Sequence, residues 1–242
     1  MNIYEHDFTI EYPDINQNNE LSDYGFFKYL QEVGCLHASL LKFGLDNSKE
    51  THLVWILLDW KLKIYSRPAW KTKIHVVTWP SKMELATCYR DYEIYGEDNT
   101  LLAKATSKWV LFNIETNHIS KIFPEVASKF SCVDKHVFNS QIEKLKEPLS
   151  YENTFTYTIL RKDIDTNHHV NNLNYIQFAL EALPLDVYQN TNFSSIEIMY
   201  KKQCLLGDTI TCYCHKENEE EYIISVKNSK ENLLHAIIRL RV

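Results

Sequence analysis

The order of secondary-structure elements predicted along this 242-residue chain occurs twice. A period of two up to Tyr12 predicts a strand; a polar loop and an apolar stripe then predict a helix over 22–43. Four β-rich segments follow, at 53–64, 71–79, 84–95 and 101–113. Two short loops can resemble each other by chance, but a whole order of elements that occurs twice is hard to explain by chance. The repeated order is therefore the feature that constrains the fold most.

The second half repeats the pattern with a strand at 153–160, a polar loop and a helix at 172–187. The helix prediction rests on an apolar stripe formed by Leu173, Ile176, Leu180 and Leu183. Four more strands are predicted at 195–204, 209–215, 221–226 and 233–241.

A long helix wrapped by a strongly bent antiparallel sheet is the hotdog arrangement. We therefore expect an α+β protein with two tandem repeats, a double hotdog. The predicted organisation is an N-terminal hotdog over 1–130, a connector over 131–150 and a C-terminal hotdog over 151–242. A short helix is expected to begin at Pro124.

Two details concern the interior of the first repeat. Gly34 lies within the predicted helix, where glycine costs about 1 kcal/mol relative to alanine, so we expect a close packing contact there. All five tryptophans fall in the first half, which suits an apolar chamber or an ordinary core equally well.

Composition excludes several classes of protein. No apolar run reaches the roughly eighteen residues of a membrane helix, so no membrane insertion is expected. The first residues do not resemble a signal peptide, which favours a cytoplasmic protein. A formal net charge of −6 argues against nucleic-acid binding. The six cysteines lack C-x-x-C spacing, so we expect free thiols and no metal or cofactor.

The densest polar segment is 163–175, which contains two carboxylates, two imidazoles and four carboxamides. Such groups are costly to desolvate unless they pair with one another, which points to a chemical site. The alternative is a solvated loop in which Asn172 caps a helix. The first loop shares its letters, because Asp14-x-Asn16-x-Asn18 matches Asp165-x-Asn167-x-His169. Only the second copy has the histidine, which singles out His169.

The motif resembles that of the acyl-[acyl-carrier-protein] thioesterases of plants and bacteria. The resemblance rests on 163–175, read as D-x-D-x-N-x-H-V-N-N-x-x-Y, and on Glu181 and Pro184. Residues 200–204, which begin thirty-one residues after His169, match the second functional segment of the family in spacing. In the first half, 67–70 and 78–80 also resemble the family.

The resemblance implies hydrolysis of a fatty acyl thioester on an acyl carrier protein, which releases the fatty acid and ends chain elongation. It also implies that the C-terminal hotdog is catalytic and that the N-terminal hotdog forms the acyl-chain chamber. The N-terminal copy lacks the histidine, and Asn18 is expected at its place.

Thioester hydrolysis needs an activated water and donors for the oxyanion. His169 is the predicted general acid and base, because imidazole titrates near neutral pH. Asn167 is expected to hold the water, and Asp165 to orient Asn167 or His169. The backbone N–H groups at the start of the following helix, from Val170 and Asn171 to Asn172, are the predicted oxyanion donors. His168 should face away and is assigned no role.

One residue departs from the family pattern. A glutamate usually precedes the cysteine of the second segment, and Gln203 stands there instead. Gln203 is expected to position water, since a carboxamide cannot take up a proton. Cys204 is either a nucleophile activated by His169 or a packed core thiol.

Basic residues in the first half suggest a docking surface for an acidic carrier protein, although most such stripes are solvated sheet faces. They are Lys61, Lys63, Arg67, Lys71 and Lys73. Alternative functions are an acyl-CoA thioesterase, a weakly active acyl-binding protein, and a hotdog dehydratase. The dehydratase is disfavoured because its motif places histidine five residues after aspartate, with a proline between. A monomer and a homodimer are both compatible with the sequence.

Overall fold

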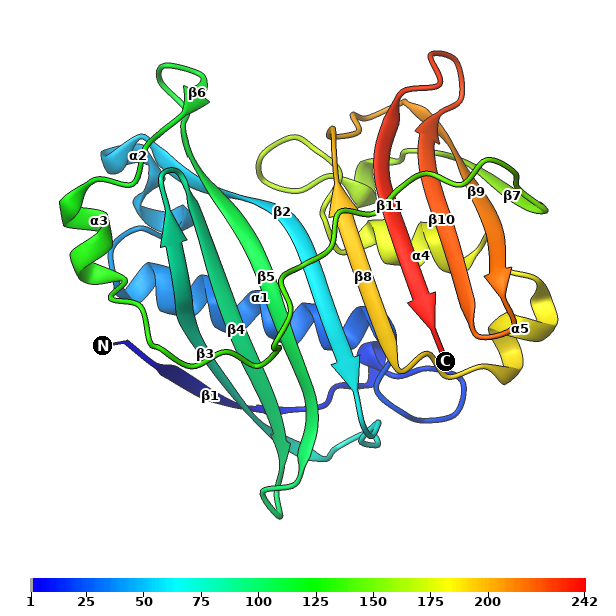
Figure 1. The fold of residues 1–242 in the computed structure, drawn as a ribbon, viewed down its shortest axis with the longest axis horizontal. Coiled ribbons are helices and arrows are strands. Elements are labelled where there is room, and N and C mark those ends of the chain that lie inside the picture. The colour runs from blue at the N-terminus through cyan, green and yellow to red at the C-terminus, as the bar shows by residue number, and fades with distance from the viewer. Residues whose placement is uncertain (1) are drawn as a thin grey trace. The chain divides into compact units, whose positions relative to one another are not determined.

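A computed structural model describes residues 2–242 and divides them into two compact units (Figure 1). The first unit ends at Ile142 and the second begins at Glu143. This division falls within the predicted connector, 131–150.

The first unit contains a five-stranded antiparallel core in the order β1-β3-β4-β5-β2. Its strands are β1 (Tyr4–Thr9), β2 (Leu53–Ile64), β3 (Lys73–Glu84), β4 (Thr87–Gly96), β5 (Leu101–Asn113) and the short β6 (His118–Ile119), which pairs with β5. Its helices are η1 (Tyr12–Asp14), α1 (Asp23–Leu40), η2 (Leu45–Asn47), α2 (Ser48–Thr51) and α3 (Pro124–Lys129). The predicted short helix at Pro124 is therefore confirmed.

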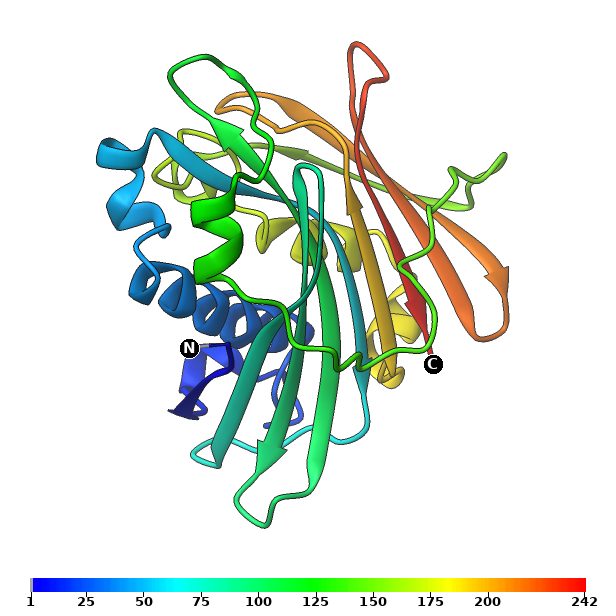
Figure 2. The same ribbon diagram turned by 60° about the vertical axis from the view of Figure 1, so that its left-hand side comes forward.

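Helix α1 begins at a side-chain cap, because Ser22 Oγ accepts the backbone N–H of Gly25 at 3.0 Å. The helix lies behind β3, β4 and β5 in Figure 1 and along the inner side of the same strands in Figure 2. A methyl group on Gly34 would lie 3.1 Å from Tyr92 Oη, so the predicted close contact is confirmed. Trp60 and Trp79 are fully buried in this unit.

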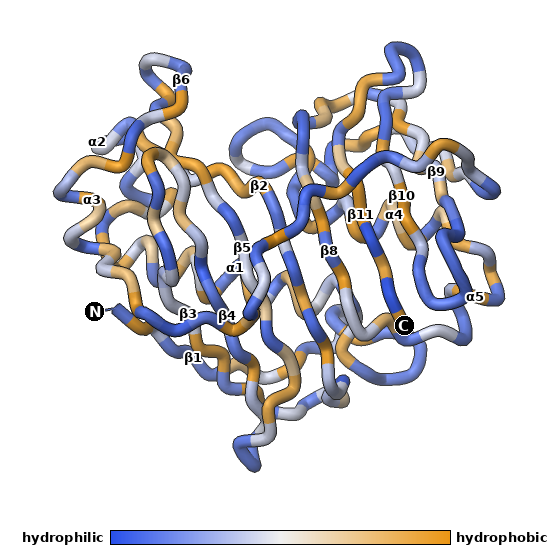
Figure 3. The backbone as a smooth tube through the Cα atoms, in the orientation of Figure 1, coloured by the Kyte–Doolittle hydropathy of each residue, from blue (hydrophilic) through white to orange (hydrophobic). Residues whose placement is uncertain are grey.

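The second unit repeats the topology, with strand order β7-β9-β10-β11-β8. Its strands are β7 (Asn153–Thr158), β8 (Ser195–Tyr200), β9 (Thr209–Asn218), β10 (Glu221–Asn228) and β11 (Leu234–Arg241), and its helices are η3 (Arg161–Asp163), α4 (Asn174–Leu180) and α5 (Leu185–Asn190). Hydrophobic and hydrophilic residues alternate along these strands (Figure 3). Both units thus place one helix against a bent sheet, which confirms the double hotdog.

The predicted helix over 172–187 is wrong in its length. Helix α4 ends at Leu180, a turn follows, and α5 begins only at Leu185. Pro184 takes an extended conformation with ψ of 142°. Proline has no N–H to donate and disfavours helical geometry in the residue before it, so the helix stops short of it.

Several predicted strand ends also differ from the structure. Strand β8 ends at Tyr200 and not at 204, so Gln203 and Cys204 lie in the segment after it. Lys71 precedes β3 and has a positive φ of 68°. A strand can end within a run of polar residues while the alternation of polar and apolar residues continues. The sequence pattern therefore does not mark where these strands end.

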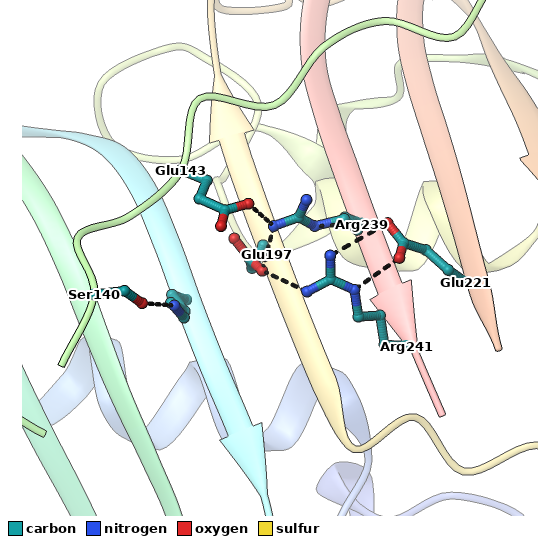
Figure 4. Close-up of polar contacts among 7 residues, drawn as sticks. Ser140, Glu143, Glu197, Glu221, Arg239 and Arg241 are labelled. Atoms are coloured by element: carbon teal, nitrogen blue, oxygen red, sulfur yellow. Dashed lines mark hydrogen bonds and ion pairs between the residues drawn. The ribbon is translucent and has the colours of Figure 1, made fainter. Parts of the chain in front are cut away.

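The segment from Glu143 is fixed to the sheet of the second unit by ion pairs (Figure 4). Arg239 Nη2 lies 2.9 Å from Glu143 and 2.7 Å from the buried Glu197, and Arg241 Nε lies 2.9 Å from Glu221. Leu145 packs against Met199 and Ile237. Across residues 2–242, no helix is both long enough and apolar enough to cross a membrane.

Candidate active site

The predicted catalytic loop is a tight, internally bonded turn. Ile164 and Val170 form an antiparallel bridge across it. Inside the bridge, the N–H of Asp165 donates to the carbonyl of His169 at 2.8 Å, and the N–H of His168 donates to the carbonyl of Asp165 at 3.1 Å. His168 is exposed with φ of 62°, a left-handed conformation that closes the turn. The turn therefore fixes the backbone of His169.

Asp165 organises this turn through its carboxylate. Oδ1 accepts the N–H of Asn167 at 2.8 Å and that of His169 at 3.5 Å. Oδ2 accepts a longer bond from Asn167 Nδ2 at 3.4 Å. Asp165 thus holds both residues mainly through their backbones, as an Asx turn does.

A second aspartate, Asp163, anchors the base of the loop. Its buried carboxylate accepts the N–H of Leu160 at 2.8 Å and the hydroxyl of Tyr157 at 2.9 Å. Its carbonyl accepts the N–H of Asn171 at 2.9 Å and Asn174 Nδ2 at 3.1 Å. The sequence assigned Asp163 no separate role, although its position at the start of the motif could have indicated one.

The structure brings the second predicted segment against this loop. The N–H of Val170 donates to the carbonyl of Cys204 at 3.0 Å, and the N–H of Cys204 donates to Tyr175 Oη at 3.1 Å. Both backbone polar groups of Cys204 are therefore held by residues of the motif. This arrangement places Gln203 beside the loop, and Tyr175 is a residue whose role the sequence reasoning missed.

Cys204 and Gln203 differ sharply in their surroundings. Cys204 is fully buried, and burial raises the pKa of its thiol to about 12. The thiolate is the nucleophilic form, so this thiol is inert near neutral pH. Gln203 is exposed, and its side chain is free to face solvent or substrate. Cys204 is thus a packed thiol, and Gln203 is an exposed amide beside it.

Two of the predicted oxyanion donors, the N–H groups of Val170 and Asn171, are wrong. The N–H groups of Val170 and Asn171 are occupied by the carbonyls of Cys204 and Asp163. The N-cap expectation for Asn172 is also wrong: α4 starts after Leu173, and the N–H of Leu173 donates to Asn171 Oδ1 at 3.0 Å. These bonds form because the loop turns back on itself before the helix begins, which the linear motif does not reveal.

The first unit contains a copy of the same turn, shifted by two residues from the match between the letters. Ile15 bridges Leu21 as Ile164 bridges Val170. Asn16 Oδ1 accepts the N–H groups of Asn18 at 2.9 Å and Glu20 at 3.1 Å. Asn16 therefore corresponds to Asp165 and Asn18 to Asn167. Glu20, and not Asn18, stands at the place of His169, so that prediction is wrong.

In the first unit, Pro68 lies at the position equivalent to Cys204 and keeps only one of the two backbone hydrogen bonds. The N–H of Leu21 donates to the carbonyl of Pro68 at 2.8 Å, as that of Val170 does to Cys204. Pro68 has no N–H, and Phe26, which replaces Tyr175, has no hydroxyl. Donor and acceptor are thus absent together in the copy that lacks the histidine.

Arg67 takes the place of Gln203 in this copy. Its guanidinium pairs with Asp23 and donates to the carbonyl of Leu21 at 3.0 Å, and its side chain is only 7% exposed. The prediction that Arg67 helps dock a carrier is therefore wrong, because a buried, paired guanidinium cannot reach a partner.

The other predicted docking lysines lie on the first unit. Lys61 Nζ donates to Ser140 Oγ at 3.0 Å (Figure 4), and Lys71 Nζ lies 4.2 Å from the centre of the Trp70 ring. Lys63 is half-buried and Lys73 is exposed.

Comparison with known proteins relates both halves of the chain to one family. Residues 1–130 match the acyl-ACP thioesterase N-terminal domain, and residues 146–237 match the acyl-ACP thioesterase C-terminal domain. Oleoyl-acyl carrier protein thioesterase 1 of Arabidopsis thaliana is 26% identical over 86% of the chain and 62% of its own length. A palmitoyl-acyl carrier protein thioesterase of Cuphea hookeriana is 27% identical over 84% of the chain and 52% of its own length. The chain thus spans less than two thirds of these curated relatives.

Solved structures share the fold across almost the full chain. An acyl-ACP thioesterase from Bacteroides thetaiotaomicron aligns with a TM-score of 0.86 at 22% identity, covering 99% of this chain and 97% of that one. The 12:0-ACP thioesterase from Umbellularia californica aligns with a TM-score of 0.87 at 20% identity, covering 99% and 96%. Because the N-terminal and C-terminal domains of this family match the chain in that order, the chain belongs to the acyl-ACP thioesterase family.

Proposed function

We propose that this protein hydrolyses the thioester of a fatty acyl-[acyl-carrier protein], releasing the free fatty acid and ending chain elongation. The observation that carries the proposal is the loop that fixes His169 and Asn167 through Asp165 and is closed by the backbone of Cys204. Membership of the acyl-ACP thioesterase family supports the same reaction. The cytoplasmic location and the oligomeric state stay predictions.

In the proposed reaction, His169 accepts a proton from water as the water oxygen bonds to the thioester carbon. The resulting tetrahedral oxyanion collapses, the carbon–sulfur bond breaks, and the imidazolium returns the proton to the departing thiolate. Asn167 and Gln203 orient the water through their carboxamides. His169 is half-exposed, so both water and substrate have access to it.

For the oxyanion, the backbone N–H of Asn172 is the proposed donor. Those of Val170 and Asn171 are already bonded within the loop. Oxyanion donors act best when they are pre-positioned, and Asn172 is positioned because its carbonyl accepts the hydroxyl of Tyr200 at 3.0 Å.

The test is hydrolysis of the same acyl chain on acyl carrier protein and on CoA, over a panel of chain lengths. We expect release of fatty acid with a higher kcat/KM on the carrier substrate. Equal or faster cleavage of acyl-CoA favours the acyl-CoA thioesterase. Acyl binding without cleavage of either substrate favours the non-catalytic binding protein.

A further inference from the structure

Three exposed leucines lie next to the catalytic loop in the second unit. Leu160, Leu205 and Leu206 are 48%, 49% and 55% exposed. The segments that contain these leucines are joined by two backbone hydrogen bonds. The N–H of Gly207 donates to the carbonyl of Ile159 at 3.1 Å, and the N–H of Ile159 donates to the backbone carbonyl of Asp208 at 2.9 Å. A group of exposed apolar side chains at one place on the surface marks a contact site more often than a single leucine does.

The same two segments, 160–162 and 201–206, contain four exposed cations and no acidic residue. The cations are Arg161, Lys162, Lys201 and Lys202. Within the part of the chain that the structure describes, none of them forms an ion pair within 4.0 Å. Other lysines of this unit do pair, such as Lys216 with Glu219 and Lys227 with Glu147. In a chain of net charge −6, four unneutralised cations form a distinct local field.

This surface adjoins the proposed reacting residues directly. Segment 201–206 contains Gln203, and Cys204 accepts the N–H of Val170, which follows His169. The nearby carboxylates are less exposed than these cations, because Asp163 is buried and both Asp165 and Asp208 are half-buried. The cations therefore dominate the charge that faces the solvent here. A partner bound here lies next to the loop that contains His169.

We propose that segments 160–162 and 201–206, here named the basic rim, dock the acidic face of the acyl carrier protein. The leucines supply apolar contact and the surrounding cations supply steering and register, the usual arrangement of an apolar centre with a charged border. The basic rim rests on the proposed function, because it names the partner surface of that same site. It replaces the lysines of the first unit as the main docking surface.

Charge reversal tests the rim. The variants are Arg161→Glu/Lys162→Glu and Lys201→Glu/Lys202→Glu, assayed with one acyl chain on the carrier protein and on a short neutral thiol. We expect KM for the acyl-carrier substrate to rise about tenfold with kcat little changed, and its salt dependence to weaken. Cleavage of the short thioester should be much less affected.

Two further pairs make the comparison specific. Lys144→Glu/Lys146→Glu changes two exposed lysines of the same unit by the same charge, and should leave KM for the carrier substrate within about twofold. Lys71→Glu/Lys73→Glu tests the first unit. An equal or larger rise in KM with either of these pairs overturns the basic rim. An equal loss of activity on the short thioester in the folded glutamate variants of the rim also overturns it.

Two outcomes separate the rim from the reaction. If KM for acyl-CoA rises as much as KM for the acyl-carrier, the rim recognises phosphate and the proposal is overturned. If the unmodified protein cleaves neither substrate, the proposed function fails, and direct titration of the carrier protein against the rim variants still decides whether the rim binds it.

Discussion

Tyr175 Oη accepts the backbone N–H of Cys204 at 3.1 Å, and Val170 donates to the carbonyl of the same residue at 3.0 Å. Tyr175 is buried, and burial raises the pKa of its phenol, so the hydroxyl stays protonated. The two bonds fix the backbone of the residue that follows Gln203. Phe26 and Pro68 show that the copy without the histidine has lost one of them.

Removing the hydroxyl of Tyr175 should therefore loosen Gln203. In Tyr175→Phe the buried N–H of Cys204 is left without its acceptor, which costs about 1–3 kcal/mol of stability. We expect kcat for the acyl-carrier substrate to fall about tenfold while KM changes little. Tyr200→Phe removes the bond to the carbonyl of Asn172, so a loss of kcat in that variant reports on the proposed oxyanion donor and not on Gln203. An unchanged kcat in Tyr175→Phe would show that Gln203 needs no such support.

His169→Ala should abolish thioester cleavage while the protein stays folded. General acid–base catalysis contributes on the order of 10²–10⁴ in rate, so the loss in kcat should fall in that range. Circular dichroism checks the fold, and His168→Ala is the matched control, because His168 is exposed on the same turn. Activity that survives in His169→Ala removes this histidine from the mechanism.

Gln203→Glu should keep or raise activity. The side chain is exposed, so a carboxylate there is solvated and available as a second base beside His169. The measurement is kcat/KM against pH for both forms. A large loss would mean that the amide itself, through its N–H donors, is what the site requires.

Cys204→Ala should retain most activity if Cys204 is a packed thiol, at a cost of about 1 kcal/mol for the deleted atom. The pKa of this thiol is raised from 9.0 to about 12, so it remains protonated in the folded state at neutral pH. The protonated thiol therefore contributes fully to the free energy of unfolding below about pH 9. That contribution is lost as the pH rises towards 12. We also expect iodoacetamide to label Cys204 slowly at pH 8. Rapid labelling with loss of activity would instead support Cys204 as the nucleophile.

Much of the fold was predictable because hydrophobic period is a local property. Strands β2 and β5 begin and end where the runs of β-forming residues placed them, at 53–64 and 101–113. The second helix was harder. The stripe from Leu173 to Leu183 extends past the end of α4 at Leu180, since a side-chain pattern carries no information about the missing backbone donor of Pro184.

The sequence by itself determined the duplicated order of elements, the family resemblance and the singling out of His169. Only the tertiary structure decided which residues are equivalent in the two loops, which backbone donors are already occupied, and that Arg67 is buried. The physical reason is that hydrogen bonds between distant segments, such as Val170 with Cys204 and Leu21 with Pro68, set the register. A one-dimensional match of letters contains no such bond, and so it aligned Asn18 where the structure places Glu20.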